Sequence, residues 1–126
     1  MILDSCFLID LMTKDERAVA KLDELVESAT PMGVSTLTVT EVGSGLRDES
    51  ERDEFDDTID QMELIPFGRS ESRRAARLQR RLQSDGQRVG AIDVMIAATA
   101  LEQDRGVVTR NVSEFDRIDD VRVSPY

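Results

Sequence analysis

The sequence predicts an α/β fold: a small, mostly parallel β-sheet with helices on both faces. Short apolar stretches alternate with longer segments in which apolar residues recur every three or four positions. Strands that alternate with helices in this way build a parallel sheet. The chain has 126 residues, the length of one ordinary domain, and we expect residues 1–126 to form a single domain.

The first half of the chain predicts two strands and four helices. Val19, Leu22 and Val26 are spaced to face one side of a helix, and Pro31 and Gly33 mark the turn after it. The strands are expected within residues 1–4 and 33–36, and the helices within residues 5–12, 15–29, 38–46 and 48–61.

The second half predicts three strands and three helices. The segment 90–101 is apolar on almost every side and carries one charge, Asp93, which indicates a helix buried inside the domain. The strands are expected within residues 63–66, 106–109 and 121–123, and the helices within residues 70–84, 90–101 and 112–118.

The composition excludes several kinds of chemistry. The chain has no histidine, which excludes Ser-His-Asp and Cys-His nucleophilic schemes, histidine general bases and ordinary histidine-ligated zinc. If the protein is an enzyme, carboxylates are the natural candidates for its chemistry.

Charge and cysteine content indicate the surroundings of the protein. The net charge is −10, and 14 of the 16 basic residues are arginine, a surface typical of a salt-rich cytoplasm and unfavourable for broad, nonspecific binding of nucleic acids. The single cysteine, Cys6, excludes an internal disulfide and favours a cytoplasmic location. No apolar run is long enough to span a membrane, and we expect no signal peptide.

Acidic residues follow three of the expected strands and open the buried helix. They are Asp4, Glu41, Glu114 and Asp93. Because the carboxyl ends of parallel strands meet at one edge of a sheet, we expect these side chains to lie close together. Neighbouring carboxylates repel each other, and a divalent cation offsets the repulsion; oxygen ligands select Mg²⁺ or Mn²⁺. Such a site activates water and stabilises charge on a phosphodiester.

Each of these acids also has a purely structural interpretation. Asp4 is a suitable N-cap for the helix that begins at residue 5. Residues 38–41 match a capping box, and residues 111–114 match a looser one. Asp93 in a first turn complements the helix dipole. Taken singly, each structural interpretation is favoured; taken together, the four acids favour a metal site.

Four segments of the chain resemble the four motifs of PIN-domain ribonucleases, and most of all those of VapC-type toxins from toxin–antitoxin pairs. The segments read ILDSCFLIDL, STLTVTEV, IDVMIAATA and VVTRNVSEF. Each motif alone is weakly specific, but the four occur in the family's order and spacing over nearly the whole chain.

The resemblance implies a Mg²⁺- or Mn²⁺-dependent endoribonuclease that acts on structured RNA such as tRNA or rRNA. It also implies a homodimer and a cognate antitoxin that blocks the site. By motif, Asp4, Glu41 and Asp93 correspond to metal-binding acids. Ser5 matches a hydroxyl position that supports Asp4 or a water molecule on the metal, and Thr109 matches a residue that supports the acids from behind.

The fourth motif departs from the simplest family pattern. This chain has Asn111 where some members have aspartate, and it has an acid three residues later. The resemblance therefore assigns the fourth carboxylate to Glu114, with Asn111 as a neutral ligand or hydrogen-bonding partner and Asp116 as a weaker candidate. Arg110 is placed either to contact substrate phosphate or to form an ion pair with an acid of the site.

Other charged residues have simpler interpretations. Five arginines fall in the expected helix 70–84, where they could contact RNA phosphates; a solvated face with salt bridges is the favoured interpretation. They are Arg73, Arg74, Arg77, Arg80 and Arg81. We expect Asp10 to lie at the surface or at a helix end, and Cys6 to serve packing.

Three alternatives remain at this point. A phosphoacceptor of the receiver or haloacid-dehalogenase type needs a late lysine, but the only lysines are Lys14 and Lys21. A non-catalytic interaction module could keep the same fold and acids. A PIN-fold nuclease could process RNA without being a toxin.

Overall fold

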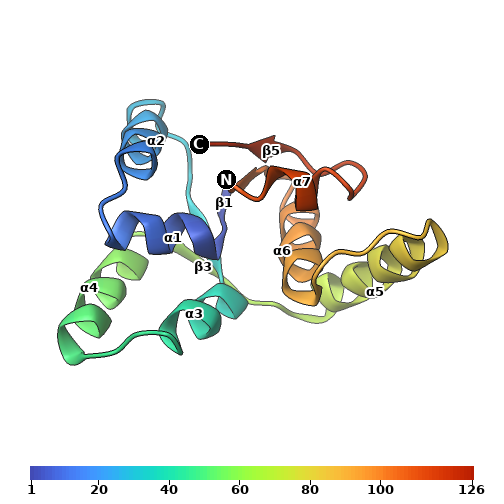
Figure 1. Cartoon of the computed structure of the whole chain (residues 1–126), viewed down its shortest axis with the longest axis horizontal. Coiled ribbons are helices and arrows are strands. Elements are labelled where there is room, and N and C mark those ends of the chain that lie inside the picture. Colours follow the sequence, from blue (N-terminus) through green and yellow to red (C-terminus); the bar gives the residue numbers. More distant parts are fainter.

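The sheet has five strands, all parallel, in the order β3-β2-β1-β4-β5 (Figure 1). The computed structural model describes residues 1–126. The strands are β1 (Ile2–Leu3), β2 (Gly33–Ser35), β3 (Glu63–Ile65), β4 (Val107–Val108) and β5 (Val123–Ser124). The chain runs outward from β1 to β3 and then returns to the other side of β1. Ligands of such sheets bind at this change of direction, beyond the carboxyl ends of the strands.

Seven helices connect the strands. They are α1 (Ser5–Met12), α2 (Glu16–Glu27), α3 (Thr36–Gly43), α4 (Glu49–Asp60), α5 (Arg69–Ser84), α6 (Ala91–Glu102) and α7 (Val112–Phe115). Every expected helix and strand is present, and the predicted α/β fold with a parallel sheet is confirmed. None of the helices has the length and apolar composition needed to cross a lipid bilayer.

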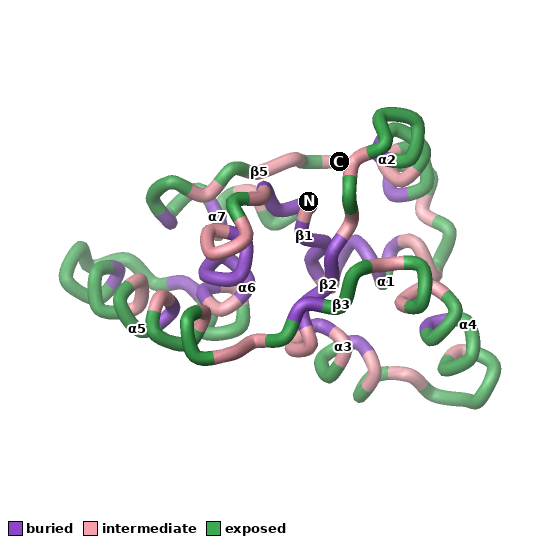
Figure 2. The backbone as a smooth tube through the Cα atoms, turned by 180° about the vertical axis from the view of Figure 1, so that it is seen from behind, coloured by how far each residue is buried: buried purple, intermediate pink, exposed green.

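Each face of the sheet has its own hydrophobic core, as alternation along the strands requires. Ile2 and Val107 pack with residues of α5, α6 and α7. The next residues, Leu3 and Val108, pack on the opposite face with residues of α1 to α4. Figure 2 shows the buried residues concentrated along the central strands and along α6. The buried helix predicted around Asp93 is therefore confirmed as the central helix of one layer.

The start of α3 differs from the sequence prediction. We expected a capping box over residues 38–41, but α3 begins at Thr36 and its N-cap is Ser35, whose side chain accepts a hydrogen bond from the Leu37 N–H at 3.1 Å. Ser35 is also the last residue of β2, so the strand passes into the helix without a loop. Thr38 is consequently buried inside the helix, and Glu41 lies more than a turn beyond the helix start.

Candidate active site

The carboxyl end of β1 presents an almost completely buried carboxylate. Asp4 is 2% exposed and is the N-cap of α1. Its Oδ1 accepts a hydrogen bond from the Ser5 N–H at 2.9 Å, and its Oδ2 accepts one from the Thr109 hydroxyl at 2.8 Å. The Cys6 thiol lies 3.5 Å from the same Oδ2. Burial of a carboxylate is costly unless it is hydrogen-bonded, and these contacts fix Asp4 in place.

Thr109 joins the ends of β1 and β4. It is completely buried, and while its hydroxyl donates to Asp4 it accepts a hydrogen bond from the Asn111 N–H at 2.9 Å. A hydroxyl has one donor and two acceptor sites, so both bonds form together. Thr109 therefore lies behind Asp4, in the position that the sequence predicted for a supporting residue.

Asp93 lies in the first turn of α6, in very different surroundings. It is half-buried, and its pKa is raised to about 6. Burial is the largest cause, followed by the negative charges of Asp4, Glu114 and Glu41, in that order. Every one of these influences raises the pKa, and no neighbouring cation lowers it. The other three acids named from the sequence therefore lie near enough to Asp93 for their charges to act on it.

The other two acids reach this region from separate helices. Glu41 is an exposed residue of α3, and Glu114 is a half-buried residue of α7. The expected place of Glu41 in a capping box at a helix start is wrong, because α3 begins earlier than expected. Glu114 Oε1 lies 3.5 Å from Arg117 Nη1, an ion pair between neighbouring turns.

The side chains of the four acids do not converge on one point. No three acidic side chains stand close enough together to hold one ion between them. A charge can shift the pKa of a carboxylate several ångströms away. A hard cation, by contrast, lies only about 2.0–2.6 Å from its oxygen ligands. The acids thus share an electrostatic environment, while their side chains are spread wider than ligation requires.

The order of the strands, the acids at their carboxyl ends and the buried α6 agree with one known family. A family model described as "PIN domain" matches residues 1–121. The chain belongs to the PIN-domain family. The resemblance inferred from the four sequence segments is confirmed.

Known PIN proteins match over nearly the full length of the chain. It is 27% identical over 125 residues to Ribonuclease VapC19 of Mycobacterium tuberculosis, covering 99% of this chain and 98% of the relative. The structure of VapBC2 from Rickettsia felis bound to a promoter DNA fragment superposes with a TM-score of 0.87 at 21% identity, over 99% of this chain and 97% of the other. DNA-bound VapBC from Salmonella typhimurium gives a TM-score of 0.86 at 25% identity, over 98% and 96% of the chains.

Next to the acids of this PIN domain lies a polar network that the sequence did not predict. Asp10 lies in the last turn of α1, as the helix-end alternative predicted, but it is only 7% exposed, so the surface alternative is wrong. Both of its oxygens accept hydrogen bonds from Arg110 Nη1, at 3.1 and 2.9 Å, and Oδ2 also accepts one from the Tyr126 hydroxyl at 2.7 Å. Phe7, three residues before Asp10 and also buried, was the available signal, because such residues share a helix face.

This network determines the surroundings of Arg110 and Tyr126. Arg110 was expected to contact substrate phosphate or to pair with an acid of the site; it pairs instead with Asp10, and its side chain stays 56% exposed. The Tyr126 ring packs edge-on against Phe7, with ring centres 5.0 Å apart. Burial, and then the hydrogen bond to Asp10, raise the pKa of Tyr126 well above its usual range.

The remaining candidates of this PIN domain contribute differently from expectation. Ser5 contacts Asp4 through its backbone N–H rather than through its hydroxyl. Asn111 is the exposed N-cap of α7, but its side chain makes no capping bond, so the looser capping box of residues 111–114 is wrong. Asp116 is an exposed residue at the end of α7. Cys6 is buried, as packing predicts, and also contacts the polar groups of Asp4 and Thr109.

Proposed function

We propose that this PIN domain is a divalent-metal-dependent endoribonuclease and the toxin of a toxin–antitoxin pair. The observation that carries the proposal is the placement of Asp93, at the start of the buried α6, where the negative charges of Asp4, Glu114 and Glu41 act on it. Uncompensated negative charge on a rigid, largely buried scaffold destabilises the fold unless it serves a positive partner. The PIN family and the similarity to a ribonuclease, VapC19, support the same conclusion.

The donor set fits Mg²⁺ or Mn²⁺. All four acids offer oxygen ligands, and the chain has no histidine and only one thiol, so softer metals have no suitable ligand set. Asp4 and Asp93 would hold the ion from positions set by β1 and α6, and Glu41 and Glu114 would complete the set. Because no three acids converge in the structure, the two glutamates would have to change rotamer; Glu41 is exposed, and Glu114 would leave its ion pair with Arg117.

The protein side of the reaction then divides into simple tasks. When bound, a divalent cation supplies charge that lowers the pKa of water and stabilises the phosphodiester transition state. Asp4, held by Thr109 and the Ser5 N–H, provides a fixed carboxylate. Asp93 is held on α6, whose buried face prevents it from moving away from Asp4. The longer side chains of Glu41 and Glu114 would change rotamer to fit the substrate.

The solved structures of similar proteins support a proposal about the partners of this chain. The solved relatives include VapBC complexes from Rickettsia felis and Salmonella typhimurium, and we infer that this chain has a cognate antitoxin, encoded by a short reading frame beside its own. We also propose a homodimer that acts on tRNA or rRNA in the cytoplasm. Toxicity on expression, relieved by co-expression of the neighbouring frame, distinguishes a toxin from a PIN nuclease that only processes RNA.

The central experiment measures RNA cleavage and its dependence on metal. Purified protein is incubated with total tRNA and with rRNA, at low and high KCl, with Mg²⁺, with Mn²⁺ or with EDTA. We expect discrete cleavage products with either metal and none with EDTA. Cleavage that persists in EDTA contradicts the metal mechanism, and the absence of cleavage in every condition favours a non-catalytic interaction module.

A further inference from the structure

Positive charge is concentrated on one helix of this acidic protein. α5 carries six arginines and a single acid, Glu71, in a chain whose net charge is −10. The arginines are Arg69, Arg73, Arg74, Arg77, Arg80 and Arg81. Nearly half of the arginines of the chain therefore lie on one helix, while the rest of the molecule is strongly negative.

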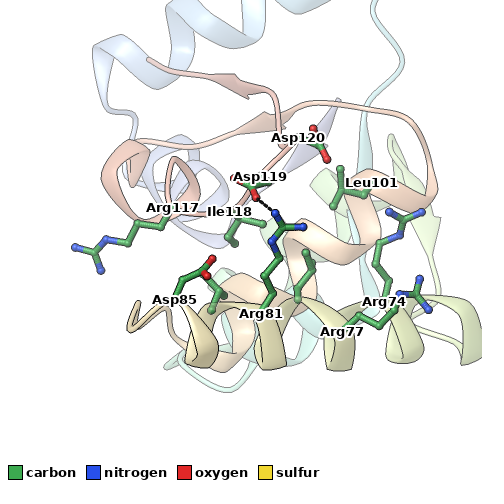
Figure 3. A pocket seen from close by; sticks show the side chains of 11 residues that line it. Arg74, Arg77, Arg81, Asp85, Leu101, Arg117, Ile118, Asp119 and Asp120 are labelled. Atoms are coloured by element: carbon green, nitrogen blue, oxygen red, sulfur yellow. Dashed lines mark ion pairs between the residues drawn. The ribbon is translucent and has the colours of Figure 1, made fainter.

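A hollow runs along this helix. It has a volume of about 260 Å³ and lies between α5, the end of α6 and the segment 117–120 that leads to β5. Figure 3 shows Arg74 and Arg77 along α5 at one end, Arg81 reaching across the hollow toward Asp119, and Arg117 at the other end. We call this surface the α5 groove.

The arginines of α5 are only partly neutralised. Arg81 pairs with Asp119 at 3.1 Å and Arg74 with Glu102 at 2.7 Å, whereas Arg73, Arg77 and Arg80 take part in none of the ion pairs of the structure. The sequence interpretation of a face occupied by salt bridges is thus correct for two of the five arginines.

The one pair that crosses the hollow is easily exchanged. The side chains of Arg81 and Asp119 are 69% and 64% exposed. Ion pairs this exposed contribute little to stability. A phosphate group, which accepts two parallel hydrogen bonds from a guanidinium, competes well for such an arginine.

One residue of the α5 groove, Arg117, contacts an acid of the proposed site. Arg117 lines the groove, and its Nη1 lies 3.5 Å from Oε1 of Glu114, one of the four acids. The same nitrogen donates to the Arg88 carbonyl at 2.7 Å, which holds the side chain between the two regions. Arg117 therefore links the wall of the groove to Glu114, one of the four acids.

We propose that the α5 groove binds backbone phosphates of the RNA substrate next to the bond that is cleaved. The inference rests on the proposed function. Arg74, Arg77 and Arg81 stand about one helical turn apart along one face, a spacing of roughly 5 Å that suits the repeating charges of a strand. Three aspartates, Asp85, Asp119 and Asp120, also line the groove, so RNA would contact the arginine face of α5 rather than the opposite wall.

The test measures RNA binding without cleavage. Anisotropy of fluorescein-labelled oligouridylate is titrated in EDTA over a range of KCl concentrations, for the wild type, for the double variant Arg77→Gln/Arg81→Gln, and for the matched control Arg17→Gln/Arg52→Gln. The control removes the same charge from exposed positions of α2 and α4. For the α5 variant only, we expect about tenfold weaker binding. The slope of the logarithm of the binding constant against the logarithm of the KCl concentration should also be smaller by roughly one to two.

The outcomes separate this inference from the proposed function. Equal weakening in both variants, or none in the α5 variant, overturns the α5 groove even if the wild type cleaves RNA. Selective weakening without any metal-dependent cleavage by the wild type supports the groove and contradicts the nuclease. Sedimentation of the RNA-free proteins is the last arm: a change of oligomeric state in the α5 variant alone identifies a contact between copies and overturns RNA binding.

Discussion

Asp4 and Asp93 both stand at the start of a helix, and their surroundings are opposite. Asp4 is 2% exposed and accepts hydrogen bonds from Ser5 and Thr109 at 2.9 and 2.8 Å. Asp93 is half-buried, and its burial and the charges of the other three acids raise its pKa. The comparison separates a carboxylate that stabilises the fold from one that the fold tolerates at a cost.

The contrast between Asp4 and Asp93 shows that a site can have fixed carboxylates and still carry negative charge that the fold does not compensate. The bonds to Asp4 define where one carboxylate stands, and the buried face of α6 brings a second one to the same region. Only the second is left without a compensating group. Loss of activity alone therefore cannot distinguish the two residues, but activity measured together with stability does.

The largest expected effect comes from Asp93→Asn. If Asp93 holds the metal as proposed, its loss is expected to reduce RNA cleavage by on the order of 100-fold or more. The free energy of unfolding, from urea titration at neutral pH, should be unchanged or higher because a repelling charge is gone. Asp57→Asn, at an exposed position of α4, is the matched control and should keep full activity. Cleavage retained by Asp93→Asn contradicts the assignment.

Asp4→Ala is expected to combine the same loss of cleavage with a loss of stability. The change removes the helix cap and leaves the buried Thr109 hydroxyl without its acceptor, a cost of about 1–3 kcal/mol. Parallel urea titrations of Asp4→Ala and Asp93→Ala measure the contrast. If the two variants are equally stable, the distinction between the carboxylates is wrong.

Thr109→Val tests whether Asp4 is held from behind. The substitution keeps the shape but removes the donor to Asp4 and the acceptor for the Asn111 N–H, which should cost about 1–2 kcal/mol. Because Asp4 then loses part of its support, metal-dependent cleavage should fall by about 10-fold or more. Thr109→Ser keeps the hydroxyl and is the control, expected to restore most of the activity. A valine variant as active as the serine variant would show that Asp4 needs no such support.

The smallest expected effect is a dependence of stability on pH. The folded protein holds the Asp93 proton with a pKa of about 6, above the value of 3.8 for a free side chain. Between these values the folded state binds more protons than the unfolded chain, so the Asp93 contribution to stability falls as pH rises from about 4 to about 6. Allowing for solvent screening of this half-buried group, the change is on the order of 1 kcal/mol.

Other carboxylates also titrate in this window, so the measurement is the difference between wild type and Asp93→Asn. Urea titrations at pH 4.5 and pH 7, without divalent metal, should show the asparagine variant gaining relative to the wild type at the higher pH. A difference that is independent of pH would mean that Asp93 is not electrostatically strained.

The fold was predictable because its signals are local. The alternation of short apolar runs and helical periodicity located each strand and helix, and the almost wholly apolar segment around Asp93 identified α6 as a buried helix. The start of α3 was missed because Thr38 and Glu41 imitate a capping box, whereas Ser35, still in the strand, makes the real cap.

The sequence identified the four acids of the candidate site, but it did not predict the hydrogen bonds of the neighbouring polar residues. Asp4, Glu41, Asp93 and Glu114 follow from strand ends and family motifs, and their roles in catalysis remain predictions. The bonds of Asp10 were not predictable, because Arg110 and Tyr126 lie at least 100 residues away in the chain. Contacts of that kind depend on tertiary packing and leave no local pattern.

Tyr126 gives this molecule an optical probe of its own. It is the only tyrosine, and the chain has no tryptophan, so nearly all ultraviolet emission comes from a ring that packs on Phe7 and donates to Asp10. Emission from this ring therefore follows whether the end of the chain is docked on α1. Binding of another molecule to this end of α1 can therefore be followed as a change in the tyrosine emission of the unlabelled protein.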